Sequence, residues 1–516
     1  MRKEPRRKHS TEKQIAINMF FSIVSFVVSL GISFFVTPYI TSQFGSEAYG
    51  FVKLADDFTR YAALFSVALN SMASRFLILQ RERGDLGSAK KYFSSITLAN
   101  IVVSFAIAIP SLICVIYLDK FLNIPPDLVS EVKLTFAITF AYFLLSFLFM
   151  TYGNCYYLAN KLDLNAIRES IVTVMRAAII LALFAIATPR ISYLALAGLT
   201  VAAFTVMYNF YYTRKLTPEF RFRFSDFEWK KLLEVLSAGI WNSIIRLSNI
   251  LASGLDLLLT NMMIGSQMMG YLSLAKTIPM LVANFSETIA QVFVPNLMTL
   301  YARNDMAEMK KATKMAVKVM CLFVSIPNAI LITMGTSFFR LWLPGEPAEM
   351  INLLAVLTII TTCVTGPAQP LYTIFVITNK VRQDTIVSSI RGFASVLITY
   401  ACLRTTGWGV YAVVGVSLVC TLIITLGYHI PYAAHYMGLP KHTFFPEVGI
   451  CLVSNLVLCG VGYLVSCVMN TGASWVMWFA AACLTGIFGL LINVMLFFNK
   501  EERASLLQTV LARIKK

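Results

Sequence analysis

Long apolar runs separated by short polar breaks follow one another along the whole chain of 516 residues. Each run holds about 20 residues or more, enough for a helix to cross about 30 Å of hydrocarbon. The alternating ten-residue pattern of membrane β-strands is absent, and a helical bundle satisfies the backbone inside lipid. We therefore predict an all-α polytopic membrane protein with about 14 transmembrane helices, near residues 14–40, 51–79, 93–118, 131–157, 166–187, 191–212, 235–263, 267–299, 309–335, 349–375, 385–404, 408–430, 447–468 and 473–497.

Part of this pattern occurs twice, at a fixed spacing of 220 residues (Gly45 to Gly265). The segment Gly45–Asp56 (GSEAYGFVKLAD) returns as Gly265–Lys276 (GSQMMGYLSLAK), and the match continues without a gap. Each copy begins a lobe with an even number of helices, so both copies insert in the same orientation. The repeat therefore predicts two six-helix lobes related by a pseudo-two-fold axis along the membrane normal, followed by two C-terminal helices.

Four segments follow from the repeat. We predict an N-terminal lobe of helices one to six at 1–213, a basic cytoplasmic linker at 214–234, a C-terminal lobe of helices seven to twelve at 235–430, and helices 13 and 14 with a basic cytoplasmic tail at 431–516. Aromatic and basic residues in 226–236 also predict a short helix at the membrane interface.

Charged residues change the picture mainly through their placement. The composition is 58% hydrophobic and 13% charged, with a formal net charge of +17. In the predicted topology, about 31 of the 43 lysines and arginines lie on one side of the membrane. This positive-inside bias indicates a multi-pass membrane protein with both termini in the cytoplasm. It also argues against nucleic acid as a partner, because the basic loops are placed to meet membrane lipids.

Polar side chains inside the predicted helices gather on helices two, five, seven and eight, at spacings of three and four that place them on one helix face. Charges within a membrane normally face protein or water, so these stripes predict a central cavity. We predict three groups of site residues: substrate-binding cations at Arg60, Arg176, Arg246 and Lys276; a polar lining at Asn70, Asn242, Asn249, Asn284 and Gln291; and carboxylates for ion or proton coupling at Asp56, Asp57, Asp256 and Glu287.

Each of these charges has a simpler interpretation as part of a structural ion pair, for which Asp56 and Arg60 have the right spacing. The repeat also aligns Asp56 with Lys276, which raises the hypothesis of a pair between the lobes. Lys53 lies near a predicted helix end, where we expect its ammonium group to reach the lipid headgroups.

Catalytic motifs are missing from the sequence. No phosphate-binding Gly-rich loop, zinc-binding His-Glu-x-x-His motif or serine nucleophile motif occurs, and the four histidines, His429 among them, fall in tails and at loop edges. The ten cysteines have no metal-ligand spacing and are interpreted as small apolar residues. We expect no catalytic residue, no metal and no bound cofactor other than a coupled proton or Na+, so the chain is not expected to be an enzyme.

The two lobes with two extra helices, and the turn Phe44–Gly50 (FGSEAYG) after the first helix, resemble the polysaccharide-exporter branch of the multidrug/oligosaccharidyl-lipid/polysaccharide (MOP) superfamily, which includes O-antigen and capsule flippases. The resemblance covers nearly the whole chain. It implies an alternating-access flippase of the inner (plasma) membrane. Such a flippase moves a polyprenyl-diphosphate-linked oligosaccharide to the outer leaflet for surface polysaccharides such as lipopolysaccharide. The expected partners are this substrate, membrane lipids and the polysaccharide polymerase machinery.

Two other functions stay open. Relatives that flip a peptidoglycan-precursor lipid also have 14 helices and a basic cavity. Ion-coupled multidrug exporters of the same superfamily typically have 12 helices and acidic cavities, which fits this sequence less well.

Overall fold

The computed structural model describes residues 5–159 and 161–497, and every regular element in these ranges is a helix. Thirteen helices within the described residues are long and apolar enough to cross a membrane. The first of them, Phe34–Glu82, contains the end of the first predicted helix and the whole of the second. The prediction of an all-α polytopic membrane protein is confirmed.

The chain folds as two compact units, each described here by itself. Unit 1 comprises Met1–Ile250 and Asn261–Gly270, and unit 2 comprises Leu251–Thr260 and Tyr271–Lys516. The predicted lobe boundaries at 213 and 235 come from the sequence repeat. They stay a prediction, because the two units are defined by their compactness and do not test the symmetry of the lobes.

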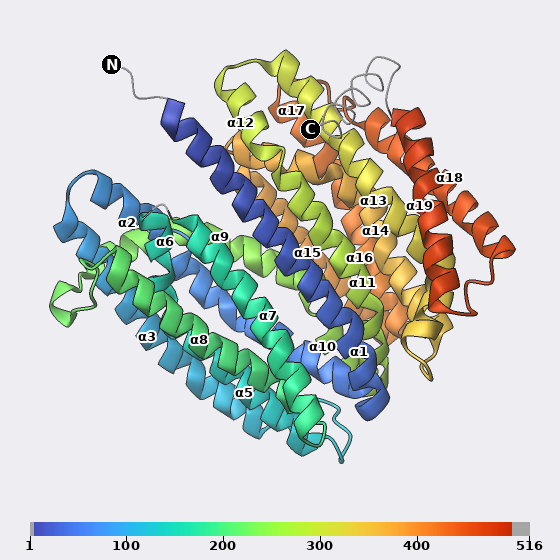
Figure 1. Cartoon of the computed structure of the whole chain (residues 1–516), viewed down its shortest axis with the longest axis horizontal. Helices are drawn as coiled ribbons and strands as arrows, with labels where there is room; N and C mark the ends of the chain where they lie inside the picture. Colours follow the sequence, from blue (N-terminus) through green and yellow to red (C-terminus); the bar gives the residue numbers. More distant parts are fainter. Residues whose placement is uncertain (1–4, 160, 498–516) are drawn as a thin grey trace. The chain divides into compact units, whose positions relative to one another are not determined.

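Unit 1 contains nine complete α-helices, and parts of two more at 261–270, within the described residues. Helices α3, α5 and α8 lie side by side (Figure 1). The predicted break near 188–190 is confirmed, because α7 ends at Ile186 and α8 begins at Ser192. The bounds are α1 Pro5–Asn70, α2 Ala73–Glu82, α3 Leu86–Ile116, α4 Leu118–Phe121, α5 Val129–Leu148, α6 Cys155–Leu158, α7 Leu162–Ile186, α8 Ser192–Leu216 and α9 Trp229–Asn249, with short 3-10 turns at Met150–Asn154 and Phe224–Asp226.

The long helix α1 combines the first two predicted helices and turns sharply between them at Gly45. Gly45 has φ 80° and ψ 167°, a conformation open almost only to glycine. Helix α1 contacts α5, α7 and α9. Beyond the turn, Asp56 of α1 accepts a hydrogen bond from Tyr142 of α5.

The prediction of a short interface helix at 226–236 is wrong, because the chain from Trp229 to Asn249 forms one continuous helix, α9. Leu232 and Val235 are buried, and Val235 belongs to an apolar core with Phe93 and Phe220. Burial against α1 and α3 has overridden the amphipathic pattern that favoured a surface location. Helix α9 is thus an integral part of unit 1.

Unit 2 is built mainly from α13, α14 and the helices packed on them. Helices α18 and α19 lie side by side (Figure 1). The break predicted near 405–407 is confirmed between α15 and α16. The bounds are α10 Asp256–Met263, α11 Ser266–Gln291, α12 Val294–Ala302, α13 Met306–Trp342, α14 Ala348–Ile377, α15 Val381–Thr405, α16 Val410–Ile424, α17 Ile430–Tyr436, α18 Phe445–Val468 and α19 Trp475–Phe497, with π-helical turns η3 Ile250–Gly254 and η4 Thr425–His429.

The helix predicted over 267–299 is interrupted, and the cause is a proline. Helix α11 ends at Gln291, and Pro295 is in the first turn of α12. Proline has no N–H to donate to the carbonyl four residues earlier, and its ring clashes with that carbonyl. The carbonyl in question is that of Gln291, which explains where the first helix stops.

Each unit carries one copy of a helix start that the repeat predicts to be equivalent. Asp85 caps α3 by accepting a hydrogen bond from the Ser88 N–H at 2.9 Å, and Asp305 caps α13 in the same way through the Glu308 N–H at 3.0 Å. The residues before the caps, Gly84 and Asn304, both have positive φ. The local geometry therefore repeats along with the sequence.

Close backbone contact joins the two copies of the repeated turn within unit 1. A Cβ atom at Gly270 would lie 2.6 Å from the Ser46 carbonyl carbon, and one at Gly50 would lie 3.0 Å from the Gly270 Cα. Asn123 and Asn261 add hydrogen bonds between side chain and backbone, with the Asn123 Nδ2 donating to the Asn261 carbonyl at 2.6 Å. Glycine is required where the two turns meet.

We predict that Gly270→Ala lowers the free energy of unfolding by about 1–3 kcal/mol, because the added methyl group overlaps backbone atoms. Thermal unfolding of the purified protein in detergent measures the loss. Gly415→Ala in α16 is the control, since nothing lies within 4 Å of its Cβ position. Equal unfolding temperatures for the two variants would contradict a tight contact at Gly270.

Candidate functional site

A polar cavity of about 260 Å³ lies inside unit 1, between α1, α7 and α8. Its charged lining residues are Lys53, Asp56 and Arg176, and Thr37, Tyr49 and Thr173 add hydroxyl groups. All six residues belong to helices long and apolar enough to span a membrane. Ionised groups at such positions normally mark a substrate or ion pathway.

Helix α1 contributes most of the polar groups from one face. Tyr49, Lys53 and Asp56 are spaced four and three residues apart, which aligns their side chains along the helix. The Lys53 Nζ lies 5.2 Å from the centroid of the Tyr49 ring, within the range of a cation–π contact. Across the unit, the Tyr142 hydroxyl of α5 donates to the Asp56 Oδ1 at 3.0 Å and fixes that carboxylate.

Arg176 enters the cavity from α7. Its side chain is exposed and makes no hydrogen bond or ion pair with any residue in the described ranges. Together, Lys53, Arg176 and Asp56 give the cavity a formal charge of +1. Because the guanidinium group presents forked donors that match phosphate oxygens, the cavity has the chemistry to hold an anion.

Lys53 is the residue whose role the sequence analysis misjudged. We expected it to reach headgroups from a helix end, but the structure places it inside the cavity. Its spacing of three residues from Asp56 was the available signal. The predicted pair of Asp56 with Arg60 is wrong as well, because Arg60 Nη1 instead lies 3.3 Å from the Asp57 Oδ1.

The other predicted residues of unit 1 lie outside this cavity. Asn70 donates to the Asn100 side chain at 3.0 Å, and Asn242 donates to the Ser71 hydroxyl at 3.1 Å. Near the end of α9, Arg246 is half-buried and Asn249 is exposed. Of the four predicted cations, the structure therefore brings Arg176 into the cavity, and Arg60 and Arg246 are not among its lining residues.

In unit 2, the predicted charges form one compact pair and one exposed stripe. Lys276 Nζ lies 2.5 Å from the Asp256 Oδ2, and both side chains are largely buried. Asn284, Glu287 and Gln291 are exposed on α11. The pairing of Asp56 with Lys276 across the repeat stays a prediction.

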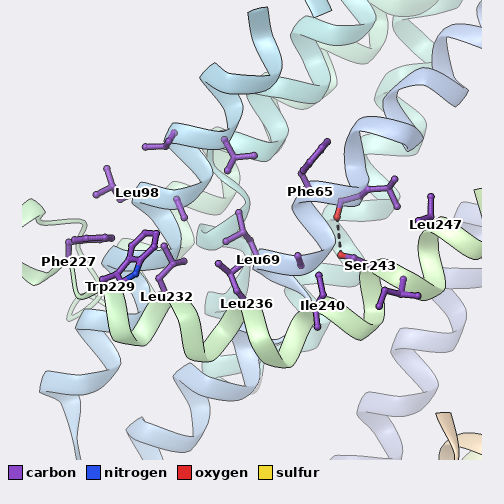
Figure 2. A pocket seen from close by; sticks show the side chains of 16 residues that line it. Phe65, Leu69, Leu98, Phe227, Trp229, Leu232, Leu236, Ile240, Ser243 and Leu247 are labelled. Atoms are coloured by element: carbon purple, nitrogen blue, oxygen red, sulfur yellow. Dashed lines mark hydrogen bonds between the residues drawn. The ribbon is translucent and has the colours of Figure 1, made fainter. Parts of the chain in front are cut away.

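An apolar groove of about 570 Å³ runs along α9 in unit 1, where α9 faces α1 and α3 (Figure 2). Of its 16 lining residues, only Ser243 has an aliphatic hydroxyl, which donates to the Leu64 carbonyl at 3.0 Å. The groove extends from Phe227 and Trp229 at one end to Leu247 at the other. Such a surface suits a hydrocarbon chain.

The ion pair in unit 2 yields a stability prediction. Lys276→Met leaves the Asp256 carboxylate, 13% exposed, without its ion-pair partner, so we expect a loss of about 3 kcal/mol in unfolding free energy. Denaturant unfolding in detergent measures it. Adding Asp256→Leu to Lys276→Met removes the isolated charge and should recover most of the loss. A double variant as unstable as the single one would rule out this account.

Comparisons with known proteins agree with this architecture. A family model described as polysaccharide biosynthesis protein matches residues 15–300. The uncharacterized membrane protein EpsK of Bacillus subtilis (strain 168) is 26% identical over 503 residues, covering 98% of each chain. An inward-facing multidrug resistance MATE family transporter of the MOP superfamily has a TM-score of 0.65 at 13% identity, covering 82% of this chain and 94% of its own.

A second solved structure, the lipid II flippase MurJ in an inward closed conformation, has a TM-score of 0.62 at 15% identity, covering 93% of this chain and 98% of its own. These two likenesses establish the fold, and the family model covers more than half of the chain. The chain therefore belongs to the polysaccharide biosynthesis protein family, as a multi-pass membrane protein with the fold of these two solved structures.

Proposed function

We propose that this protein is a transporter. It moves a polyprenyl-diphosphate-linked oligosaccharide from the cytoplasmic to the outer leaflet of the plasma membrane, by alternating access. Both termini lie in the cytoplasm. The product supplies cell-surface polysaccharide synthesis, so the polymerase machinery that consumes it is the proposed partner.

The observation that carries this proposal is the positively charged cavity of unit 1. A diphosphate cannot cross hydrocarbon unaided, because the transfer of its charge out of water costs many kcal/mol. Lys53 and Arg176 offer two cations within spanning helices, and Arg176 has no protein partner in the described residues. The hydroxyl groups of Thr37, Tyr49 and Thr173 can hydrogen-bond to phosphate or sugar oxygens.

The remaining predicted residues keep secondary roles in this proposal. Arg60, Arg246 and Lys276 are further contacts for the anionic headgroup at other stages of transport, and the polar residues Asn70, Asn242, Asn249, Asn284 and Gln291 interact with sugars. Asp56, Asp57, Asp256 and Glu287 stay candidates for coupling to a proton or Na+.

The groove along α9 supplies a place for the polyprenyl chain. From Trp229 to Leu247 it follows 18 residues of helix, about 27 Å at 1.5 Å per residue, which nearly equals the hydrocarbon thickness of about 30 Å. A phospholipid acyl chain reaches only the half of that depth in its own leaflet, whereas a polyprenyl chain is long enough for all of it. Arg221, Arg223 and Lys230 are exposed near the Trp229 end and can attract the phosphates.

The charge of the cavity also separates this proposal from the alternatives. A surplus of cations repels the cationic drugs that many multidrug exporters carry, so we place drug export last. A peptidoglycan-precursor lipid has the same polyprenyl diphosphate and remains the competing substrate, and it differs only in the sugar and peptide beyond the phosphates.

The first test replaces the free cation of the cavity. Arg176→Ala should lower the rate at which a polyprenyl-diphosphate oligosaccharide moves between the leaflets of proteoliposomes by about tenfold. This factor is equivalent to about 1.4 kcal/mol of charge-assisted binding. Adding Lys53→Ala should reduce it further. A fluorescent oligosaccharide accessible to quenching or enzymatic cleavage on one side reports the movement.

Lys133→Ala is the matched control, because Lys133 is a cation of the same unit that pairs with Asp119 at 2.6 Å, outside the cavity. Normal transport by both Arg176→Ala and the double variant would remove the cavity from the substrate path. A peptidoglycan-precursor lipid, run in parallel, decides between the two lipid substrates.

A second test fills the groove. Val102→Trp places a large ring in the groove and should slow transport several-fold, whereas Phe105→Trp on the same helix, at a position that is exposed but not in the lining, should leave it unchanged. The length of the polyprenyl chain offers a second readout. A short-chain analogue does not fill the groove, so Val102→Trp should slow its transport less. Equal rates for the two tryptophan variants would exclude the groove as the site of the chain.

A further inference from the structure

A buried polar cluster lies in unit 2, where α14 and α15 meet the π-helical turn η4. The His429 Nε2 lies 3.1 Å from the Asp384 Oδ1 of α15, and the His429 ring centroid lies 4.7 Å from that of Tyr372 in α14. His429 is only 8% exposed. The sequence had placed this histidine at a loop edge, but the chain stays helical from Val410 to Tyr436.

Three atoms of this cluster are buried without a hydrogen-bond partner among the described residues: His429 Nδ1, Arg391 Nε and the Tyr428 hydroxyl. The contact with the Asp384 carboxylate favours the tautomer in which Nε2 carries the proton. The lone pair of neutral His429 is then on Nδ1. That atom can accept a proton without breaking any hydrogen bond within the described part of the chain.

The internal repeat provides a comparison for this position. Tyr428 and His429 stand 220 residues after Tyr208 and Asn209, the spacing of the repeated turns. In unit 1, the Asn209 Oδ1 accepts hydrogen bonds from Arg168 Nη1 at 2.6 Å and from the Tyr156 hydroxyl at 2.9 Å. Asparagine stays uncharged, whereas the histidine at the same position of the other copy can bind a proton.

The backbone differs between the copies as well. Helix α8 is regular from Ser192 to Leu216, whereas its counterpart in unit 2 is interrupted by η4 at Thr425–His429. π-helical turns are rare and occur frequently at functional sites. His429 thus lies on the turn that interrupts this helix.

We propose that His429 and Asp384 form a proton-binding site, and that protonation of His429 strengthens the contact of η4 with α15. Nε2 of neutral His429 donates one hydrogen bond to the Asp384 carboxylate, 3.1 Å away. The added proton converts this hydrogen bond into an ion pair between groups that are largely shielded from water. The protonated form therefore favours the arrangement in which η4 is held against α15.

The other titratable groups around the cluster are neutral or basic. Tyr372 and Tyr428 are neutral near pH 7, and Arg391 adds positive charge. From α17 and the adjacent loops, His435 packs edge-on against Tyr432, Lys441 lies over the Tyr432 ring and Lys380 lies over the Tyr436 ring. Asp384 is the only acidic group that these contacts bring to His429 within the described residues.

We therefore expect the exchange of the backbone amides around η4 to depend on pH. Hydrogen–deuterium exchange of the full-length protein in detergent, corrected for intrinsic exchange at each pH, should show residues 420–436 exchanging several-fold more slowly at pH 5.5 than at pH 8. His429→Asn installs the residue of unit 1 and should abolish the difference. Asp384→Asn should change its midpoint.

Unit 1 serves as the internal control, because residues 200–216 should exchange equally at both pH values. Asn209→His should make them sensitive to pH if the copies are equivalent in this respect. A pH response that survives in His429→Asn, or that is absent from the wild type, would overturn the proposal.

Proton binding at this site does not depend on the transported substrate, but its use as a driving force rests on the proposed function. Transport measurements in proteoliposomes with opposite pH gradients test the driving force separately from proton binding. If wild-type transport follows the gradient, His429→Asn should uncouple it while retaining transport down a substrate gradient. If no oligosaccharide is transported at all, the proposed function fails, and the exchange measurement still decides the proton site.

Discussion

The constraint that organises this protein is that an ionised side chain within a membrane-spanning helix needs an oppositely charged partner, a hydrogen bond or water. Most such charges of the described residues have one: Arg60 with Asp57, Lys276 with Asp256, Asp384 with His429, and Asp56 with the Tyr142 hydroxyl. Arg176, which lines the cavity, makes no such contact within the described residues. The cost of an unpaired cation in a spanning helix falls when an anion occupies the cavity.

The fold followed from the sequence because hydrocarbon thickness limits helix length so strictly. The breaks at 188–190 and 405–407 lie where the apolar runs stop. The sequence analysis was wrong where a local pattern competed with packing. The segment from Trp229 to Leu236 has the composition of a surface helix, but the partners of Leu232 and Val235 lie on α1 and α3, far away in the sequence. Pro295 carried its own signal, since a missing N–H ends the preceding helix four residues earlier.

The site was less accessible to sequence reasoning. Helical spacing aligned Asp56 with its own helix neighbours, but the group that binds it, Tyr142, comes from α5. Likewise, nothing near His429 in the sequence indicates Asp384, 45 residues earlier. Spacing within a helix shows which side chains share a face, whereas contacts between helices decide which charge is neutralised and which stays available to a ligand.

The assignment of Asn261–Gly270 to unit 1, between two stretches that belong to unit 2, has a consequence for biogenesis. During translation, the ribosome releases Ile250 before the ten residues that complete the packing around Ser46 and Gly50. Unit 1 must therefore persist in the membrane with that surface uncovered until the later segment is inserted. A fragment truncated at the linker would lack it permanently, so the first half of this chain is not expected to be a self-sufficient folding unit in the cell.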